Sequence, residues 1–327
     1  MISVIIPYFN KNSDRFIEVL LLRAIKSVIR ELEGKYNFQV IVIDDGSPRT
    51  PELIIETVNH PKVILSCQKH KKLGAARNKG LDLAEGDLII FLDADDFYFC
   101  GTLAPCVKAM MQKDADLLMF SMVKCQNIKK TSIRQSPPRF LAPETGREYM
   151  RKHTVRGSSC QFIFKKSLVT DHNLRFVENI FIEDEEFTPR LVYYSEKMVR
   201  TNYKVYAYFQ RKDSIINKKS ILELDERSAY TILVIRSLIE FRKGVSEPAG
   251  GGLERKINFL AVDHIRRALQ RPDWKRNLCF ELSSLRELGL YPLPNTPYSH
   301  KYIWFRLLSK NKAGLRVLRS IEKMTIK

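Results

Sequence analysis

The sequence lacks the features that define several protein classes. Its six cysteines include no C-x-x-C pair and no histidine at zinc-ligand spacing, so we expect reduced thiols in a cytoplasmic protein. No stretch approaches the roughly 18 apolar residues that span a bilayer, and the first apolar run is too short for a signal peptide. We therefore expect no export and, at most, a peripheral membrane contact. Neither G-x-G-x-x-G nor a P-loop pattern follows the first apolar run, which argues against dinucleotide-binding and P-loop folds.

Acidic residues are scarce relative to basic ones. The chain has 55 Lys and Arg against 37 Asp and Glu, a formal charge of +18. This favours a polyanionic partner, and charge alone leaves a phosphate-rich ligand, nucleic acid and anionic lipid open. With 44% hydrophobic and 28% charged residues the composition is that of a globular protein. At about 150 residues per domain, the length predicts roughly two domains.

Short apolar runs alternate with amphipathic stretches over the first 120 residues. Strands are predicted at 3–8, 39–44, 62–67, 88–92 and 116–121. Helices are predicted at 15–33, 50–59, 73–85 and 102–113, the third ending at a C-cap glycine, Gly86. This alternation predicts an α/β fold with a mainly parallel open sheet.

Polar loops follow three of these strands, which end in PYFN, DDGS and DADD. Ligands of open α/β sheets bind at the carboxyl ends of the strands, so these loops are the candidate site. Asp93, Asp95 and Asp96 come directly after a buried strand, where a divalent cation such as Mg²⁺ or Mn²⁺ would offset their repulsion. The alternative is a solvated acidic turn.

The DDGS loop places Asp44 and Asp45 at a strand end, with Gly46 allowing a tight turn. A carboxylate there can accept a hydrogen bond from a base imide or a ribose hydroxyl. The alternative is an Asx-turn without a ligand.

The later part of the chain changes character. Residues 130–146 are proline-rich and basic and predict a loop, and 205–209 (VYAYF) predict a strand. From 221 the periodicity is helical, with PAGGG at 248–252 predicted to separate two helices. We therefore expect one domain over 1–220 and a smaller, basic helical region over 221–327.

Six motifs in order resemble one family. SVIIPYFN, IDDGS, GAARNKGL, FLDADD, FIEDEEF and YAYFQRKDSI resemble the family 2 glycosyltransferases of the GT-A fold, the Rossmann-like nucleotide-diphospho-sugar transferase fold, of the type that builds bacterial surface polysaccharides. The resemblance covers about the first 215 residues. The Q-x-x-R-W sequence of processive members is absent, which favours addition of single sugars.

The resemblance implies roles for individual residues. Pro7 and Tyr8 would border the base and Asp45 would bind the uracil. Asp93 would face the ribose and Asp95 would bind the metal, with Asp96 as a further candidate. The residues expected beside the nucleotide also include Asp44, Lys72, Arg77 and Asn78.

The E-D pair of FIEDEEF matches the position of the family's catalytic base, which implies this role for Asp184. Inverting transfer needs a carboxylate that removes the acceptor hydroxyl proton opposite the leaving diphosphate. The alternative is an acidic first turn of a helix, favoured by the helix dipole. Arg211 matches an arginine that closes over the diphosphate, with an exposed basic loop as the alternative.

The expected function is therefore inverting, metal-dependent transfer of a sugar from a nucleotide sugar, expected to be a UDP-sugar, to a glycan acceptor that can be lipid-linked. It would act in capsular or lipopolysaccharide-type assembly, with Mn²⁺ or Mg²⁺ as cofactor. A nucleotidyltransferase and a basic nucleic-acid-binding protein are the alternatives; we expect no nucleic acid partner, because such binding leaves the acidic loops unexplained.

Residues 301–327 contain eight Lys or Arg and one acid, Glu322, with apolar residues at helical spacing and a break near 311–314. Basic amphipathic helices of this kind suit an anionic membrane surface, which would place the protein at the inner face of the cell membrane. The alternative is a helix pair packed on its own domain.

Overall fold

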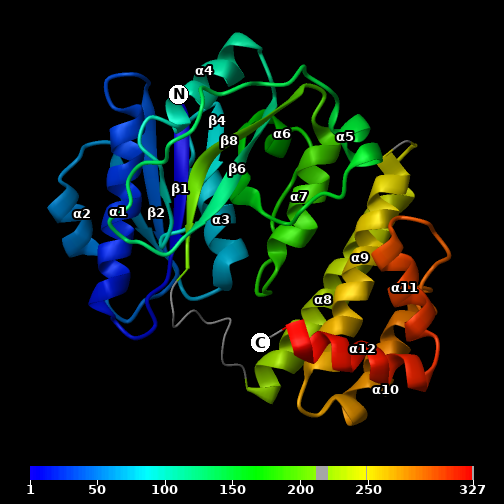
Figure 1. Cartoon of the computed structure of the whole chain (residues 1–327). Coiled ribbons are helices and arrows are strands. Elements are labelled where there is room, and N and C mark those ends of the chain that lie inside the picture. The colour runs from blue at the N-terminus through cyan, green and yellow to red at the C-terminus, as the bar shows by residue number, and fades with distance from the viewer. Residues whose placement is uncertain (211–219, 248, 326–327) are drawn as a thin grey trace. The chain divides into compact units, whose positions relative to one another are not determined.

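The computed structural model shown in Figure 1 describes residues 1–210, 220–247 and 249–325, with the backbone alone for 324 and 325. The chain divides into two units. One comprises Met1–Tyr149 and Arg156–Lys218, and the other comprises Met150–Val155 and Lys219–Lys327. The first unit is built on a sheet and the second on helices.

The first unit contains one mixed sheet, which has eight strands in the described part of the chain, in the order β3-β2-β1-β4-β7-β6-β8-β5. Their bounds are β1 Ile2–Tyr8, β2 Phe38–Asp44, β3 Val63–Cys67, β4 Leu88–Phe91, β5 Phe97–Tyr98, β6 Leu117–Cys125, β7 Phe162–Lys165 and β8 Met198–Phe209. β1, β2, β3 and β4 pair in parallel, as do β6 and β8, whereas β7 is antiparallel to both neighbours and β5 is antiparallel to β8.

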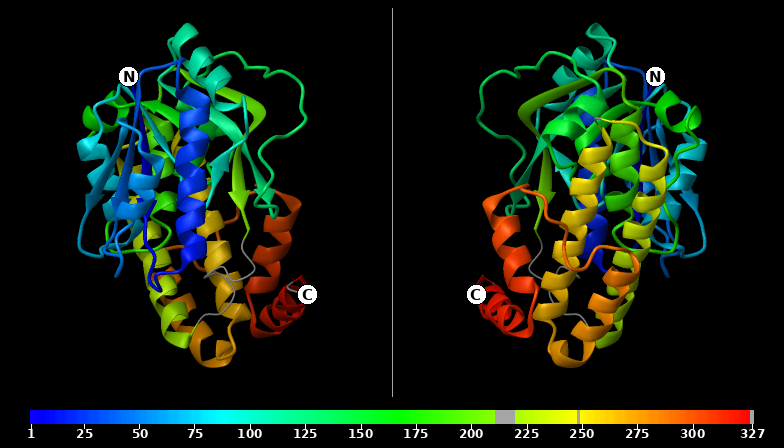
Figure 2. Two further views of the ribbon diagram at one scale, coloured as in Figure 1. Left: turned by 90° about the vertical axis from the view of Figure 1, so that its left-hand side faces the viewer. Right: turned by 90° about the vertical axis from the view of Figure 1, so that its right-hand side faces the viewer.

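Helices connect these strands. They are α1 Arg15–Leu32, α2 Glu52–Val58, α3 Lys72–Leu83, α4 Leu103–Gln112, α5 Gly146–Lys152, α6 Ser167–Thr170 and α7 Glu183–Tyr194, with a 3₁₀ turn at Ser159–Gln161. Every residue of β1, β2 and β4 is buried, as expected for parallel strands covered on both faces. α1 runs along the sheet (Figure 2, left view) and begins at Asp14, whose carboxylate accepts a hydrogen bond from the amide of Phe16.

The strand order explains where a ligand can bind. The chain steps outward from β1 to β2 and β3, and then returns to place β4 on the other side of β1. Because such crossovers are right-handed, α3 lies on the face of the sheet opposite to α1 and α2. The connections therefore diverge between β1 and β4, and an open α/β sheet binds its ligand at such a switch point.

The predicted sheet is confirmed. All five predicted strands and all four predicted helices occur, with most ends within two residues of the prediction. The two-residue β5 and the four-residue β7 are additions that no apolar run was long enough to predict. The strand predicted at 205–209 is the last part of the longer β8.

The prediction for Gly86 is wrong, because α3 ends at Leu83 with Ala84 as its C-cap. A Cβ atom at Gly86 would lie 2.6 Å from the backbone nitrogen of Ser3 in β1. The amide of Gly86 also donates a hydrogen bond to Ser3 Oγ at 2.8 Å. Glycine is present here because the chain passes close to the backbone at the start of β1.

The second unit contains five helices in its described residues, namely α8 Ile221–Lys243, α9 Ala249–Gln270, α10 Trp274–Glu287, α11 His300–Ser309 and α12 Lys312–Thr325. α8 begins with a capping box between Ser220 and Glu223. The prediction that PAGGG separates two helices is wrong in its position, since Gly250, Gly251 and Gly252 belong to the start of α9. A Cβ atom at Gly252 would collide with the backbone of Met150, so the close approach of that segment explains one of these glycines. No described helix is long and apolar enough to cross a membrane.

Candidate active site

A cavity of about 880 Å³ opens at the switch point between β1 and β4. Its walls come from the end of β1 (Pro7 and Tyr8), from the loop after it, including Phe9, and from the loop after β4, including Asp93 and Asp95. Leu73 at the start of α3 and residues 126, 128, 209 and 210 close its sides. The cavity therefore lies where the topology alone places a ligand.

The two aromatic residues that end β1 differ in accessibility. Tyr8 is 2% exposed, and burial raises the pKa of its hydroxyl to about 12. Phe9 is 40% exposed and stacks on the ring of His70, with 4.2 Å between the ring centroids. Phe9 is therefore the more accessible aromatic face at the cavity, whereas Tyr8 lines the cavity but is almost completely buried.

The DDGS loop is tied to its neighbours by short hydrogen bonds. Asp44 accepts bonds from the backbone amide and the hydroxyl of Ser47, and burial raises the pKa of the Asp44 carboxyl. Ser47 Oγ accepts a bond from the amide of Asn10, which joins the loops after β1 and β2. Gly46 has a φ of +77°, and a Cβ atom there would lie 2.8 Å from the backbone nitrogen of His70.

The Asp45 carboxylate is almost fully occupied by protein donors. Its Oδ1 accepts hydrogen bonds from Gln68 Nε2 at 2.7 Å and from the Lys71 amide at 2.9 Å. Its Oδ2 lies 2.9 Å from His70 Nδ1. His70 Nδ1 also lies 3.0 Å from the Asp45 carbonyl oxygen, so it occupies at most one acceptor position of Oδ2. Of the roughly four acceptor positions of an ionised carboxylate, at least one therefore remains for an N–H group.

The three carboxylates after β4 have different surroundings. Asp96 is fully buried, with its oxygens accepting bonds from the Tyr206 hydroxyl at 2.6 Å and the Phe209 amide at 2.7 Å. Burial raises the pKa of Asp96 well above its ordinary value. The Asp93 side chain is one-third exposed, and Asp95 is partly buried at the cavity wall.

A buried arginine connects this loop to α7. Arg77, in α3, is 1% exposed, and its Nη1 donates to Glu183 Oε1 at 2.6 Å and to Asp184 Oδ1 at 2.9 Å. Its Nη2 donates to Asp93 Oδ1 at 3.0 Å. One guanidinium thus links the Asp93 carboxylate to those of Glu183 and Asp184, which lie more than 100 positions from Arg77 in the sequence.

The E-D pair begins α7, where the helix dipole favours negative charge. Glu183 is buried, whereas the Asp184 side chain retains 21% exposure. Burial raises the pKa of Glu183 to about 7 and also raises that of Asp184, and Arg77 opposes both shifts. The preceding residue, Ile182, has a φ of 65°, a left-handed conformation that β-branched residues rarely adopt. The chain is thus held in a strained turn where it presents these carboxylates.

The other predicted site residues are placed as follows. Asn78 is buried, and its amide group bonds both the N–H and the C=O of Phe176, so it fixes the segment that precedes α7. Lys72 has a φ of 66° and its ammonium lies over the ring of Phe181, 4.5 Å from the centroid. Arg211 lies outside the described residues. The roles proposed for all of these residues stay predictions.

The residues after β4 fit a divalent cation of the magnesium type. Asp93 and Asp95 supply hard oxygen atoms at the cavity, whereas both oxygens of Asp96 accept protein hydrogen bonds. Among the described residues, no group of three His, Cys, Asp or Glu side chains is arranged to hold a metal. A cation held by one or two carboxylates and completed by substrate phosphates and water agrees with this donor set.

Two residues of the site, Phe9 and His70, were missed by the sequence analysis. They form the exposed stack beside Asp45. Glu183, the other member of the E-D pair, shares Arg77 with Asp184. A local signal existed for Phe9, because in a strand buried on both faces the residue just past the end is the first that can face solvent. The sequence contains no local signal that His70 would reach Asp45.

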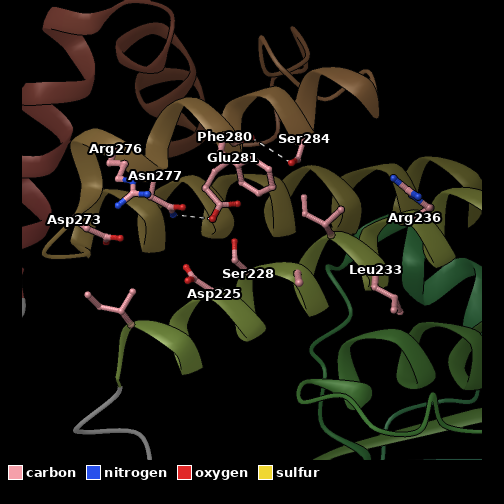
Figure 3. A pocket seen from close by; sticks show the side chains of 13 residues that line it. Asp225, Ser228, Leu233, Arg236, Asp273, Arg276, Asn277, Phe280, Glu281 and Ser284 are labelled. Atoms are coloured by element: carbon pink, nitrogen blue, oxygen red, sulfur yellow. Dashed lines mark hydrogen bonds between the residues drawn. The ribbon is translucent and has the colours of Figure 1, made fainter.

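A second cavity, of about 720 Å³, lies between α8 and α10 of the helical unit (Figure 3). Its acidic groups have partners within that unit. Arg271 binds both Asp225 and Asp273, and Glu281 binds His264 and Asn277. Because these charges are compensated, we place the candidate site at the sheet.

Comparison with known proteins identifies the family of the chain. The model of the family described as glycosyl transferase family 2 matches residues 3–170. The cholesterol galactosyltransferase of Borreliella burgdorferi is 26% identical over 248 residues, which cover 71% of this chain and 66% of that protein. The poly(ribitol-phosphate) beta-N-acetylglucosaminyltransferase TarS of Staphylococcus aureus is 25% identical over 215 residues, 64% of this chain and 36% of TarS.

Solved structures share the fold. A crystal structure of S. aureus TarS 1-349 in complex with UDP-GlcNAc superposes with a TM-score of 0.66 and 17% identity, over 98% of this chain and 90% of that one. The mannosyltransferase PcManGT from Pyrobaculum calidifontis, in complex with GDP-Man and Mn²⁺, gives a TM-score of 0.56 and 13% identity, over 99% and 84% of the two chains. Residues 3–170 thus form a glycosyl transferase family 2 domain with the GT-A fold, and the chain belongs to that family.

Proposed function

We propose that this protein transfers single sugars, with inversion, from a nucleotide sugar to a glycan acceptor, and that the donor is a UDP-sugar. The supporting observation is the Arg77 cluster, in which one guanidinium binds Asp93 of the donor loop and Asp184 of α7. Asp93, suited to bind the donor, and Asp184, suited to act as the base, thus bind the two terminal nitrogens of Arg77. The complexes of TarS with UDP-GlcNAc and of PcManGT with GDP-Man support a nucleotide sugar as donor.

The proposed reaction is a displacement at the anomeric carbon. Asp184 accepts the proton of the acceptor hydroxyl as its oxygen forms the new bond, and the bond to the diphosphate breaks on the opposite face. Nucleoside diphosphate leaves with the bonding electron pair. Arg77 holds Asp184 in position, and the partial exposure of that carboxylate leaves room for the acceptor to reach it.

The metal in this proposal is Mn²⁺ or Mg²⁺, held by Asp95 together with Asp93. When bound, it would offset the negative charge that develops on the leaving diphosphate. Asp96 instead supports the loop, because Tyr206 accepts a hydrogen bond from the Asp93 amide and donates one to Asp96.

The binding of donor and metal can be tested by calorimetric titration of UDP, GDP and CMP with and without Mn²⁺ or Mg²⁺. We expect metal-dependent binding of UDP, weakened at least about tenfold by Asp95→Ala because a cation ligand is lost. Asp171→Ala removes an exposed carboxylate from the same unit and should leave the affinity unchanged. A UDP affinity that changes neither with the metal nor with Asp95→Ala would contradict the proposed metal and donor site.

We propose that the base stacks on Phe9 and directs an N–H group to the remaining acceptor position of Asp45. Phe9→Ala should weaken UDP binding about 5- to 100-fold, as loss of one base-stacking ring does. Phe280→Ala removes a ring that is 69% exposed, against 40% for Phe9, from the helical unit and serves as the control. If the two variants bind UDP equally well, Phe9 does not contact the base.

We further propose that the acceptor belongs to capsular or other surface polysaccharide and is lipid-linked, which would bring the enzyme to the inner face of the cell membrane. The name of the Borreliella relative, a cholesterol galactosyltransferase, supports a lipid acceptor. A direct test is transfer from UDP-sugar to lipid-linked saccharides, with UDP release as the readout.

A further inference from the structure

The last two helices of the chain carry cations and exposed apolar side chains on the same surfaces. We call the exposed cationic and apolar side chains of α11, α12 and the turn between them the tail surface. Its cations are Lys301, Lys310, Lys312, Arg316 and Lys323, and its apolar members are Trp304, Leu307, Val317 and Ile321. Figure 2 shows the two helices at the red end of the chain, with α12 lying across the end of α11.

α12 is divided into two faces. Leu315, Leu318 and Glu322 are buried, so that face packs within the helical unit. Beside this face, Val317 and Ile321 are 49% and 43% exposed and are spaced as neighbours on a helix. Arg316 and Lys323 are also exposed and lie on one side of this apolar pair.

The one acidic residue of this segment is withdrawn from the surface. Glu322 is buried, and its carboxylate accepts bonds from Arg266 at 2.7 and 3.0 Å and from Gln270 at 2.9 Å. The charge of Glu322 is thus compensated inside the unit. The tail surface presents only positive charge to a partner.

α11 has the same character. Tyr302 and Phe305 are buried, whereas Trp304 is 66% exposed and Leu307 lies one turn further along the exposed side. Lys301 precedes this pair and Lys310 follows it, and both are exposed. An exposed tryptophan between lysines is typical of residues that lie at the boundary between lipid and water.

We propose that the tail surface docks on an anionic phospholipid bilayer, with the apolar side chains entering the interface and the cations contacting lipid phosphates. The cations alone would also suit nucleic acid, but a phosphate backbone leaves Trp304, Val317 and Ile321 exposed to water. A bilayer takes up both kinds of side chain. Only the link between docking and a lipid-linked acceptor rests on the proposed function. Docking itself requires neither donor nor acceptor.

Co-sedimentation of the full chain with vesicles tests the proposal. We expect binding to vesicles that contain phosphatidylglycerol, at least about tenfold weaker binding to pure phosphatidylcholine, and weakening by salt. Arg316→Gln with Lys323→Gln, and separately Val317→Ser with Ile321→Ser, should each lower binding about tenfold or more. Lys26→Gln with Lys108→Gln makes the same charge change at exposed sites of the first unit and should bind like the wild type.

The proposal is overturned if the wild type does not bind anionic vesicles, or if the control pair and the two tail variants lose binding equally. UDP titration of each variant shows that the first unit is intact, and circular dichroism shows that the helices are. All four altered tail residues are exposed, so a folded protein is expected in each case. If the protein binds UDP but not anionic vesicles, membrane docking is contradicted and the proposed transferase is not. If it binds vesicles but not UDP, the proposed transferase is contradicted and membrane docking is not.

Discussion

Asp184→Asn is expected to lower kcat by about 10²- to 10⁴-fold while UDP affinity stays near that of the wild type. Asparagine keeps the size of the side chain but cannot accept the acceptor's proton, and general-base catalysis contributes an effect of this size. Arg77 keeps two of its carboxylate partners, Asp93 and Glu183, so the cluster should persist. Single-turnover transfer and UDP titration measure the two quantities.

The pH profile gives a second readout of the same residue. Since burial raises the pKa of Asp184, its ionised form disappears at a higher pH than for an ordinary aspartate. The acid limb of kcat should therefore lie above the ordinary range of Asp, and it should be absent in the residual activity of Asp184→Asn. Glu196→Gln, at an exposed ion pair with Arg147, should match the wild type in rate and profile. A rate for Asp184→Asn within threefold of the wild type would exclude this residue as the base.

Arg77→Met is expected to destabilise the first unit by about 3–5 kcal/mol, because it leaves buried carboxylates without their counter-charge. For a unit of this size the loss corresponds to a fall in Tm of roughly 6–20 °C. The difference in stability between the wild type and Arg77→Met should become smaller as the pH falls from about 8 to 5, because the uncompensated carboxylates of the variant then take up protons. Differential scanning calorimetry across this pH range measures both effects.

Arg175→Met provides the matched control for Arg77→Met. Arg175 pairs with Asp82 at the surface, with both side chains about half exposed, and such pairs contribute at most about 1 kcal/mol. Equal Tm values for the two variants would mean that Arg77 is not the counter-charge of the site. Arg77→Lys tests geometry separately, since a single ammonium cannot reach both sides of the cluster as a planar guanidinium does.

The sequence was sufficient to predict the sheet, because its central strands are buried on both faces and therefore read as continuous apolar runs. It also located the acidic loop after β4, which lines the cavity. The additional strands, β5 and β7, could not be predicted from the sequence. β7 has only four residues, and its antiparallel pairing with β4 depends on contacts formed across 70 or more positions.

The internal contacts of the site could not be predicted, because they join distant segments. Nothing local distinguishes Asp96 from Asp95, and only the contacts with Tyr206 and Phe209 of β8 show that Asp96 is a buried support. Arg77 was predicted beside the nucleotide, whereas the structure records its guanidinium on the carboxylates of α7 and the β4 loop. Such pairings depend on the tertiary fold and leave no periodicity in the sequence.

The shared guanidinium of Arg77 has a thermodynamic consequence. Asp93 and Asp184 divide the positive charge of one group, so a ligand that neutralises Asp93 leaves more of that charge to Asp184. Asp184 then releases its proton more readily. By reciprocity, the ionisation of Asp184 alters the affinity of Asp93 for that same ligand by an equal free energy. Ligand binding at Asp93 and the proton affinity of Asp184 are therefore linked, and each depends on the state of the other.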